Sequence, residues 1–237
     1  MIRVLLEPGS TAVGRRVGLP EGEAHHLRVR RARHGESVGL RDGEGLLGLG
    51  RLILTGGSWS VEVTADDRAP RPAELTLAVG SGDRDRFAWV VEKATELGVT
   101  SVIPLESERT TGVASRLRAQ HLGRLRRTAL EAVKQSGAPW AARVEEPVSL
   151  GDLAARPPAG RRWVADAGGE APPAVLDETP LTVVIGPEGG LTADELHLVR
   201  GAGYAPVRLS PHTLRFETAA IAAAAAAVAG RLRGSHG

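Results

Sequence analysis

The sequence predicts an α/β protein of two domains: a small all-β domain at residues 1–70, then a larger domain with a parallel sheet at residues 74–237. Three observations predict this architecture. Turn signals separate short apolar runs up to about residue 67, apolar strands alternate with helical segments from Glu74 onward, and a proline-containing linker at residues 68–73 lies between the two patterns. Closely spaced short strands are typical of barrels and sandwiches, whereas strands alternating with helices indicate a parallel sheet.

The N-terminal part contains three short runs rich in Val, Ile, Leu and Trp. We predict strands at residues 37–40, 49–54 and 59–64, each bounded by glycine-containing turns. One helix is predicted at residues 21–31. These elements indicate a small β-barrel or sandwich that one helix interrupts.

The C-terminal part alternates between the two apolar periods. Residues 85–97 carry apolar side chains three and four positions apart, which predicts a helix with one buried face, and Gly98 ends it. Thr192 and Glu195 have the spacing of a capping box at the start of another helix. We predict strands at 75–80, 101–105, 162–165, 181–185 and 206–209, and further helices at 117–135 and 217–233.

The last predicted helix is rich in alanine, a strong helix former. Its smooth surface allows close packing against another helix, including one from a second subunit. Low-complexity drift in an Arg- and Ala-rich chain explains the same composition.

Composition excludes several classes of protein. The 237 residues include no cysteine, which excludes disulfides and thiolate metal sites, and we expect no metal. The N-terminus lacks the apolar region of a signal peptide, and outside the Ala-rich tail no stretch of ~18 apolar residues occurs. We therefore expect a cytoplasmic protein that contains no membrane segment.

The basic residues gather in two places, although the formal net charge is only +2. Residues 24–34 contain four Arg and three His, and residues 116–127 contain five Arg, with no acidic residue in either stretch. Solvated basic faces in an Arg-rich chain explain either cluster alone. Two such clusters together favour a polyanion partner, because neutralised phosphates supply most of the affinity for nucleic acid.

Two segments near the C-terminus each follow a predicted strand. They read Ile-Gly-Pro-Glu-Gly-Gly-Leu-Thr at residues 185–192 and Leu-Ser-Pro-His-Thr-Leu-Arg-Phe-Glu-Thr-Ala-Ala at residues 209–220. In open α/β sheets, ligands bind at the carboxyl ends of the strands. The sequence therefore predicts that both loops line one pocket.

The first loop lacks the features of a phosphate site. It has neither the Lys of a P-loop nor the dinucleotide-binding glycine pattern, and Glu188 would repel a phosphate. This disfavours an enzyme acting on nucleotide phosphates and favours a cationic ligand without phosphate, a description that S-adenosylmethionine meets; a plain tight turn is the alternative. In the second loop, Arg215 and Glu217 are either functional or a salt bridge at a helix start.

With these loops the sequence resembles the bacterial small-subunit rRNA uridine-N3 methyltransferases of the RsmE type, in the SPOUT superfamily. Further matches follow in the same order along the chain: His25, Arg28 to Arg31, Asp42-Gly43, residues 92–99, residues 104–109 and residues 131–136. The resemblance implies a C-terminal SPOUT trefoil-knot methyltransferase domain with a parallel sheet at residues 74–237, plus an N-terminal PUA-like β-barrel that binds RNA at residues 1–70. It also implies a homodimer.

The implied reaction is methylation of N3 of a specific uridine in 16S rRNA of the small ribosomal subunit, with S-adenosylmethionine as cofactor. The uracil N3 proton must leave, so a carboxylate could act as base, or a guanidinium could stabilise the developing anion. We expect Arg215 and Glu217 to be catalytic, with Glu188 as the other candidate base. The expected cofactor-binding residues are Ile185, Gly186, Pro187, Glu188, Gly189, Gly190, Leu209, Ser210, Leu214 and Thr218, and the expected RNA-binding residues are Arg28, Arg30, Arg31, Arg33, Arg86 and Arg109.

The chain departs from the family pattern at several positions. The family usually has Gly in place of Ser210, Arg in place of His212 and a small residue in place of Phe216. Asp83 stands where the family has Lys, and Ala138 lies in the stretch after the Gln-Ser motif, where an Arg is common. Two alternatives stay open: the same chemistry on another RNA such as tRNA, and a non-catalytic RNA-binding assembly factor.

Overall fold

The computed structural model describes residues 1–110 and 117–235, which form two compact units. The first unit comprises Met1–Arg71 and Leu130–Ala141, and the second comprises Pro72–Ala129 and Ala142–Gly237. Residues 130–141 fall within the predicted C-terminal domain, and in the structure they pack with the first unit. Main-chain hydrogen bonds account for the difference, since Gly45 N donates to Pro139 O at 2.8 Å.

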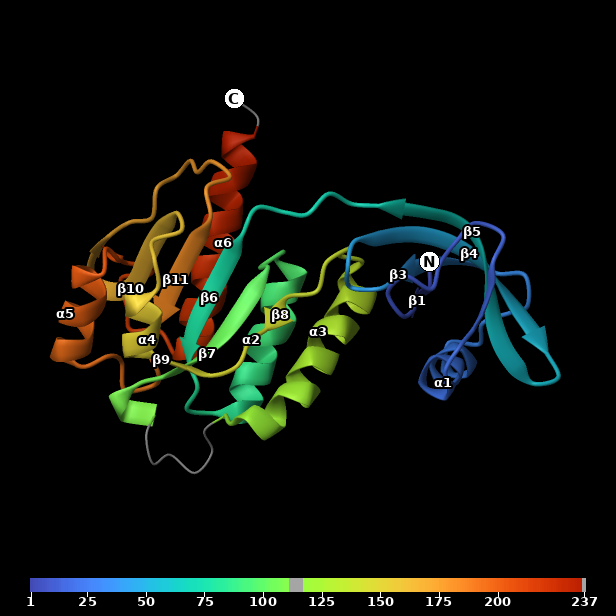
Figure 1. Cartoon of the computed structure of the whole chain (residues 1–237), viewed down its shortest axis with the longest axis horizontal. Helices are drawn as coiled ribbons and strands as arrows, with labels where there is room; N and C mark the ends of the chain where they lie inside the picture. The colour runs from blue at the N-terminus through green and yellow to red at the C-terminus, as the bar shows by residue number, and fades with distance from the viewer. Residues whose placement is uncertain (111–116, 236–237) are drawn as a thin grey trace. The chain divides into compact units, whose positions relative to one another are not determined.

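The first unit is a five-stranded sheet with one helix (Figure 1). Its strand order is β1-β3-β4-β5-β2, with β1 and β3 parallel and the other neighbours antiparallel. The three strands and the helix predicted there are confirmed, while the two shortest strands, β1 and β2, were missed. The elements are β1 (Arg3–Leu5), β2 (Arg16–Gly18), α1 (Glu21–Val29), β3 (Ser37–Arg41), β4 (Leu46–Thr55) and β5 (Ser58–Arg68).

The core of the first unit follows from alternation along β4. Side chains from Leu46 to Leu52 are buried and exposed in turn, the period-2 pattern of a strand with one buried face. Ala24 and Leu27 of α1 close the core from outside the sheet. The buried cluster comprises Val4, Leu6, Ala24, Leu27, Val38, Leu40, Leu46, Leu52, Trp59, Val61 and Val63.

The second unit is a parallel sheet with helices on both faces. The strand order is β12-β10-β11-β6-β7-β8, and β9 also pairs with β7. The elements are β6 (Leu75–Gly80), α2 (Arg84–Glu96), β7 (Ser101–Glu106), η1 (Glu108–Thr110), η2 (Ala119–His121), α3 (Leu122–Ser136), β8 (Arg143–Val144), β9 (Val148–Ser149), α4 (Leu150–Ala155), β10 (Arg161–Glu170), β11 (Leu181–Ile185), α5 (Ala193–Gly201), β12 (Ala205–Val207) and α6 (Phe216–Gly234). The last residues of α3 belong to the first unit.

Two predicted boundaries need correction. The predicted strand at 206–209 is found at Ala205–Val207, and its pairing with β10 ends with the hydrogen bond from Arg208 N to Glu170 O at 2.7 Å; Leu209 and Ser210 therefore lie in the following loop. The helix predicted from residue 117 begins as the 3₁₀ turn η2 and becomes α-helical at Leu122.

The sheet alternation sends side chains to two helical layers. Ala78, Val164 and Val184 pack with residues of α4 and α5 on one face. On the other face, α6 packs against β6, β11 and α2 through its alanine-rich side (Figure 1). The close helix packing expected of this segment is thus made with α2 of the same chain.

The loop between β10 and β11 is held on α6 near the C-terminus. Leu176 N donates to Gly230 O at 3.0 Å, and Arg233 donates to Ala174 O at 2.9 Å. The trefoil knot implied by the resemblance stays a prediction. Among the described residues, no helix has the length and apolar character needed to cross a membrane.

Candidate active site

Four loops gather at one edge of the second unit's sheet. They follow β6, β7, β11 and β12, whose pairings are all parallel, so that their carboxyl ends meet there. β6 lies between β7 and β11. The chain continues from β6 to β7 on one side and returns later to add β10, β11 and β12 on the other, so the strand order reverses between β6 and β11. Such switch points are where open α/β sheets bind ligands. The two predicted loops, after β11 and β12, are both at this edge.

Glycines let the β11 loop approach the end of β6. A Cβ atom at Gly80 would overlap Pro187, and one at Gly82 would overlap the Glu188 carboxylate. Gly190 has φ +71° and its N–H closes a turn onto Pro187 O at 2.8 Å. A left-handed backbone conformation at this position favours glycine. The Gly-rich segment is therefore a tight turn whose main chain is packed against β6.

A capping box fixes the start of α5, as predicted. Glu195 N donates to Thr192 Oγ1 at 3.3 Å, and Thr192 N donates to Glu195 Oε2 at 2.9 Å. The other oxygen, Glu195 Oε1, accepts a hydrogen bond from Glu108 N at 2.8 Å. One carboxylate thus ties the β11 loop to the loop after β7.

Arg109 reaches the same loop. Its guanidinium donates to Gly189 O, so this predicted RNA-binding residue contacts a predicted cofactor-binding residue. The bond gives Arg109 a role in shaping the loop. A contact between Arg109 and RNA stays a prediction.

Glu217 lies in the first turn of α6 and pairs with Arg86 of α2. Arg86 Nη1 is 3.3 Å from Glu217 Oε1. The Glu217 side chain is only 13% exposed, and its Oε2 is buried with no hydrogen-bond partner within residues 1–110 and 117–235. A salt bridge with Arg215 is one of the two interpretations that the sequence leaves open for Glu217, whereas the partner in the structure comes from another helix. A buried carboxylate oxygen with free acceptor capacity is costly unless a ligand or a proton uses it.

Asp83 positions Arg86. Its Oδ1 accepts hydrogen bonds from Asp85 N at 2.9 Å and Arg86 N at 3.0 Å, which caps α2. Where the family has Lys, this chain therefore has a helix cap. Asp and Asn are favoured at this position because their side-chain oxygen satisfies free N–H groups.

The loop after β12 has a local structure of its own. His212 N donates to Ser210 Oγ at 3.1 Å, and Arg215 is the exposed N-cap residue of α6. Phe216 is buried and anchors the helix start, which explains why a large residue is tolerated there. Leu209, Ser210 and Leu214 are half-buried and Thr218 is exposed.

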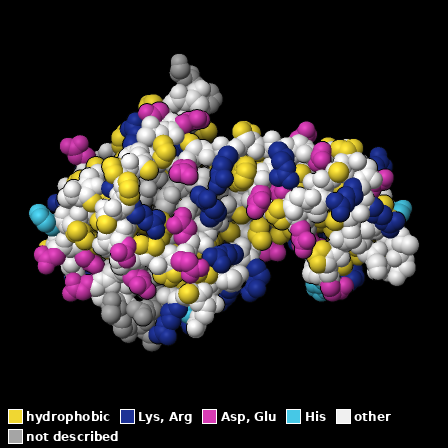
Figure 2. Space-filling view, in the orientation of Figure 1, with side chains coloured by type: hydrophobic (Ala, Val, Ile, Leu, Met, Phe, Trp, Pro, Cys, Tyr) yellow, Lys and Arg dark blue, Asp and Glu magenta, His cyan; other side chains and the backbone are white. Residues whose placement is uncertain are grey.

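The N-terminal basic cluster lies in the first unit. Arg28, in α1, pairs with Glu21, while Arg30, Arg31 and Arg33 are exposed at the end of α1 and in the turn after it. Arg116 of the second basic cluster lies outside the described residues. Figure 2 shows Lys and Arg mixed with Asp and Glu across the visible face, in keeping with a net charge of +2.

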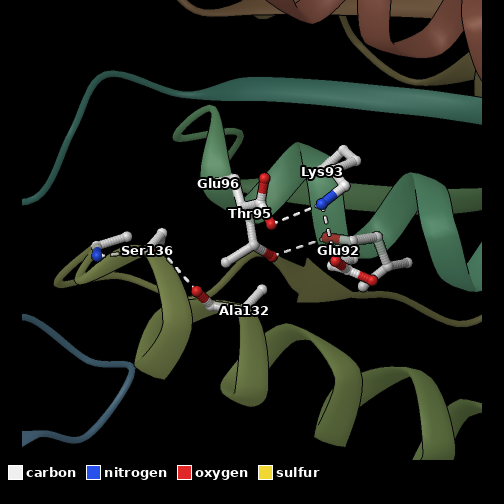
Figure 3. Close-up of polar contacts among 8 residues, drawn as sticks. Glu92, Lys93, Thr95, Glu96, Ala132 and Ser136 are labelled. Carbon is white, nitrogen blue, oxygen red and sulfur yellow. Dashed lines mark hydrogen bonds and ion pairs between the residues drawn. The ribbon is translucent and has the colours of Figure 1, made fainter. Parts of the chain in front are cut away.

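Both lysines of the chain are bound by carboxylates, which sequence reasoning missed. Lys93 Nζ contacts Glu92 at 2.8 Å and Glu96 at 2.9 Å (Figure 3), and these hydrogen bonds raise the Lys93 pKa. Lys134 Nζ contacts Glu23 at 2.7 Å, and both side chains are buried. The scarcity of Lys among 30 basic residues was the available signal.

The chain is similar to known RNA methyltransferases. Residues 69–228 match the family model of an RNA methyltransferase domain, and residues 19–65 match that of an RNA methyltransferase PUA domain. The Ribosomal RNA small subunit methyltransferase E of Aquifex aeolicus is 31% identical over 210 residues, covering 86% of this chain and 90% of the relative. The one from Synechocystis is 30% identical over 214 residues, covering 86% and 69%.

Two solved structures are similar to nearly the whole chain. The Ribosomal RNA small subunit methyltransferase E from Neisseria gonorrhoeae, bound to S-adenosylmethionine, has a TM-score of 0.84 at 29% identity and covers 95% of this chain and 96% of its own. A methyltransferase from Legionella pneumophila, also with bound S-adenosylmethionine, has a TM-score of 0.82 at 25% identity and covers 94% and 95%.

Proposed function

This chain belongs to the RNA methyltransferase family that includes the Ribosomal RNA small subunit methyltransferases E, and from that membership we propose that it methylates N3 of a specific uridine in 16S rRNA. It is an S-adenosylmethionine-dependent rRNA methyltransferase, as its named relatives and cofactor-bound structural neighbours are. The choice of uridine as the methylated nucleotide, and of N3 as the methylated atom, is supported by the family resemblance of the two loop motifs.

One observation carries the proposal: at the sheet edge where the four loops meet, Oε2 of Glu217 is buried and has no hydrogen-bond partner among the residues that the structure describes. The same edge carries the β11 loop, where Gly189 and Gly190 have no side chain to keep a ligand away from the side of the turn that faces away from β6. This loop also carries the carboxylate of Glu188, which would attract a cationic ligand. These features fit S-adenosylmethionine, a sulfonium that carries no phosphate.

The residues that would hold the cofactor come from both loops. In the β11 loop they are Ile185, Gly186, Pro187, Glu188, Gly189 and Gly190, and after β12 they are Leu209, Ser210, Leu214 and Thr218. Bound S-adenosylmethionine supplies an electrophilic methyl group. The protein must then orient the uracil and remove its N3 proton.

Glu217 is the proposed base. Arg86 holds one carboxylate oxygen at 3.3 Å, and the free Oε2 can accept the proton from N3. Arg215, exposed at the N-cap of α6, would stabilise the negative charge on a uracil carbonyl. Glu188 is the alternative base, although its exposure makes it the less protected carboxylate.

The first unit is the proposed RNA-binding domain, with residues 1–70 forming the PUA-like part. Arg28, Arg30, Arg31 and Arg33 would contact phosphates there, and Arg86 and Arg109 would do so from the second unit. We also propose a homodimer that acts in the cytoplasm, where ribosomal subunits assemble. Leu232, 59% exposed near the end of α6, supports a second subunit packing on that helix.

Methyl transfer to three substrates tests the proposal: assembled 30S subunits, free 16S rRNA and tRNA. A methyl group on uridine N3 blocks Watson–Crick pairing, so reverse transcription should stop at one position of 16S rRNA. Transfer to tRNA alone would replace the proposed substrate. Calorimetry with S-adenosylmethionine tests the non-catalytic alternative, which requires that no cofactor binds.

A further inference from the structure

Two helices of the second unit end in the same hydrogen-bonded turn, with glycine at its left-handed position. After α2, Gly98 N donates to Thr95 O at 3.1 Å and the next N–H donates to Ala94 O at 2.9 Å. After α5, Gly203 N donates to Arg200 O at 2.9 Å and the next N–H donates to Val199 O at 3.0 Å. Gly98 has φ +81° and Gly203 has φ +87°, as this double-bonded turn requires.

Helix α1 ends in the same turn with an arginine in the glycine's place. Arg31 N donates to Arg28 O at 3.0 Å, and Ala32 N donates to Leu27 O at 3.0 Å. Arg31 has φ +54°, and in the part of the chain that the structure describes it is the one non-glycine residue with positive φ. A side chain at this position is strained, because its Cβ crowds the main chain.

The surrounding core imposes this conformation. Leu27 is fully buried and Ala32 packs against the same cluster, so both residues flanking the turn are fixed. Strain held in place by its surroundings is typical of functional positions. Glycine would relieve it, as it does after α2 and α5, so the structure gives no local reason for an arginine here.

Arg31 lies in a shallow basic hollow. Its lining, which we call the α1 turn, consists of Arg30, Arg31, Arg33, His34, Gly35 and Glu36 and borders an open space of about 530 Å³. Glu36, the one acid, accepts a hydrogen bond from Arg33 N at 2.9 Å, and His34 Nδ1 accepts one from Leu54 N at 3.2 Å. These bonds shape the loop. The side chains of its three arginines are exposed and have no acceptor among the described residues.

We propose that the α1 turn is a binding site for the phosphate backbone of the substrate RNA, and that Arg31 occupies its strained position for the sake of its guanidinium. This inference rests on the proposed function. A guanidinium can hold a phosphate by two parallel hydrogen bonds. An open, shallow hollow suits the backbone rather than a base edge, so the contact would position the RNA without reading its sequence.

Four substitutions of Arg31 separate strain from charge: Gly, Asn, Lys and Ala. Each variant is measured for its melting temperature and its affinity for a 16S rRNA fragment at several salt concentrations. We expect Arg31→Gly to melt about 2–8 °C higher, because the strain is removed, with Arg31→Asn between it and the parent. The same two variants should bind RNA about 5–10-fold more weakly, with a log–log salt slope lower by about one.

The other two variants complete the test. Arg31→Lys should keep the salt slope without melting higher, and Arg31→Ala should lose affinity without melting higher. Gly203→Ala is the matched control for strain, since its Cβ would meet no atom within 4 Å. That control should melt lower while its RNA affinity stays at the parental value. The Gly variant should raise KM for rRNA and leave kcat and S-adenosylmethionine affinity unchanged.

The outcomes distinguish this inference from the proposed function. A parent protein that neither binds nor methylates 16S rRNA would overturn the proposed function. A parent that does both, with Arg31→Gly matching its affinity and salt slope, would overturn the inference alone. A Gly variant that melts no higher than the parent would remove its premise, that the arginine is strained.

Discussion

Each unit of this protein contains a glutamate with little exposed surface that is paired with a cation, and the two pairs differ in how many of the carboxylate oxygens have a partner. In the first unit, Glu23 uses both oxygens: Oε1 contacts Lys134 Nζ at 2.7 Å and Oε2 accepts from Leu5 N at 3.3 Å. In the second unit, Glu217 uses only Oε1, toward Arg86 at 3.3 Å. Its Oε2 is buried without a partner within residues 1–110 and 117–235.

This difference is the one that we expect between a structural pair and the proposed catalytic one. A carboxylate with both oxygens engaged by the protein can hold two segments together and needs no ligand. A carboxylate with one buried oxygen free is poorly placed for stability and well placed to accept a proton. The same substitution at the two positions should therefore have opposite consequences.

The largest effect is expected from Glu217→Gln. The amide keeps the shape of the side chain and an acceptor for Arg86, but it cannot take a proton. We expect kcat for rRNA methylation to fall about 10²–10⁴-fold, the range for loss of a general base, while the melting temperature changes little. Single-turnover methylation and thermal unfolding measure the two quantities.

Two variants show whether that loss is specific. Arg215→Ala should also lower turnover more than stability, because Arg215 is exposed at the start of α6. Glu188→Gln should retain most of the activity. If Glu188→Gln loses turnover and Glu217→Gln keeps it, Glu188 is the base and the comparison of the two pairs fails.

Glu23→Gln should do the reverse. Lys134 would lose its counter-ion while only 9% exposed, with Glu131 at 3.9 Å as the remaining carboxylate. Breaking a buried pair from one side costs about 3 kcal/mol, so the free energy of unfolding in urea should fall by that amount. The kcat of the folded fraction should stay at the parental value. A Glu23→Gln protein as stable as the parent would show that this pair is not structural.

The sequence predicted those features of the two units that depend on residues close together in the chain. The strand at 181–185, the capping box of Thr192 and Glu195, and the left-handed Gly98 are confirmed because neighbours in the chain determine them. Both loops were predicted to follow parallel strands, and the structure places them at one sheet edge.

The sequence could not predict the pairs themselves. Glu23 and Lys134 are 111 residues apart, and Arg86 and Glu217 are 131 residues apart. No periodicity links such distant positions. A salt bridge with the neighbouring Arg215 is therefore one of the two interpretations that the sequence offers for Glu217, and nothing in the sequence indicates that residues 130–141 pack with the first unit. Such contacts depend on tertiary packing, which a single sequence does not encode in local signals.

Arg86→Ala tests the role of the pair between Arg86 and Glu217, and its expected effect on kcat is smaller than that of Glu217→Gln. Without the guanidinium, the Glu217 carboxylate loses the contact that orients it, so we expect kcat to fall about tenfold. Stability should change by less than about 1 kcal/mol, because Arg86 is 39% exposed and solvent screens the pair. Arg86→Lys should restore part of kcat. If Arg86→Ala leaves kcat intact and weakens only RNA binding, Arg86 is a phosphate ligand rather than a positioning residue.

The smallest effect concerns His26, whose pKa responds to the charges of Lys134 and Glu23. Burial lowers the His26 pKa below its ordinary value of 6.5, and the Lys134 cation lowers it further. The unfolded chain therefore binds this proton more readily than the folded one, so stability is fully present above pH 6.5 and declines as pH falls toward the folded-state pKa. Urea unfolding across this range should give a shallower pH dependence for His26→Gln than for the parent. Because Lys134 remains charged throughout and outweighs the opposing effect of Glu23, Lys134→Met should flatten the parental slope in part, while the contribution of burial remains. A Lys134→Met slope equal to that of the parent would show that the Lys134 cation exerts no field on His26.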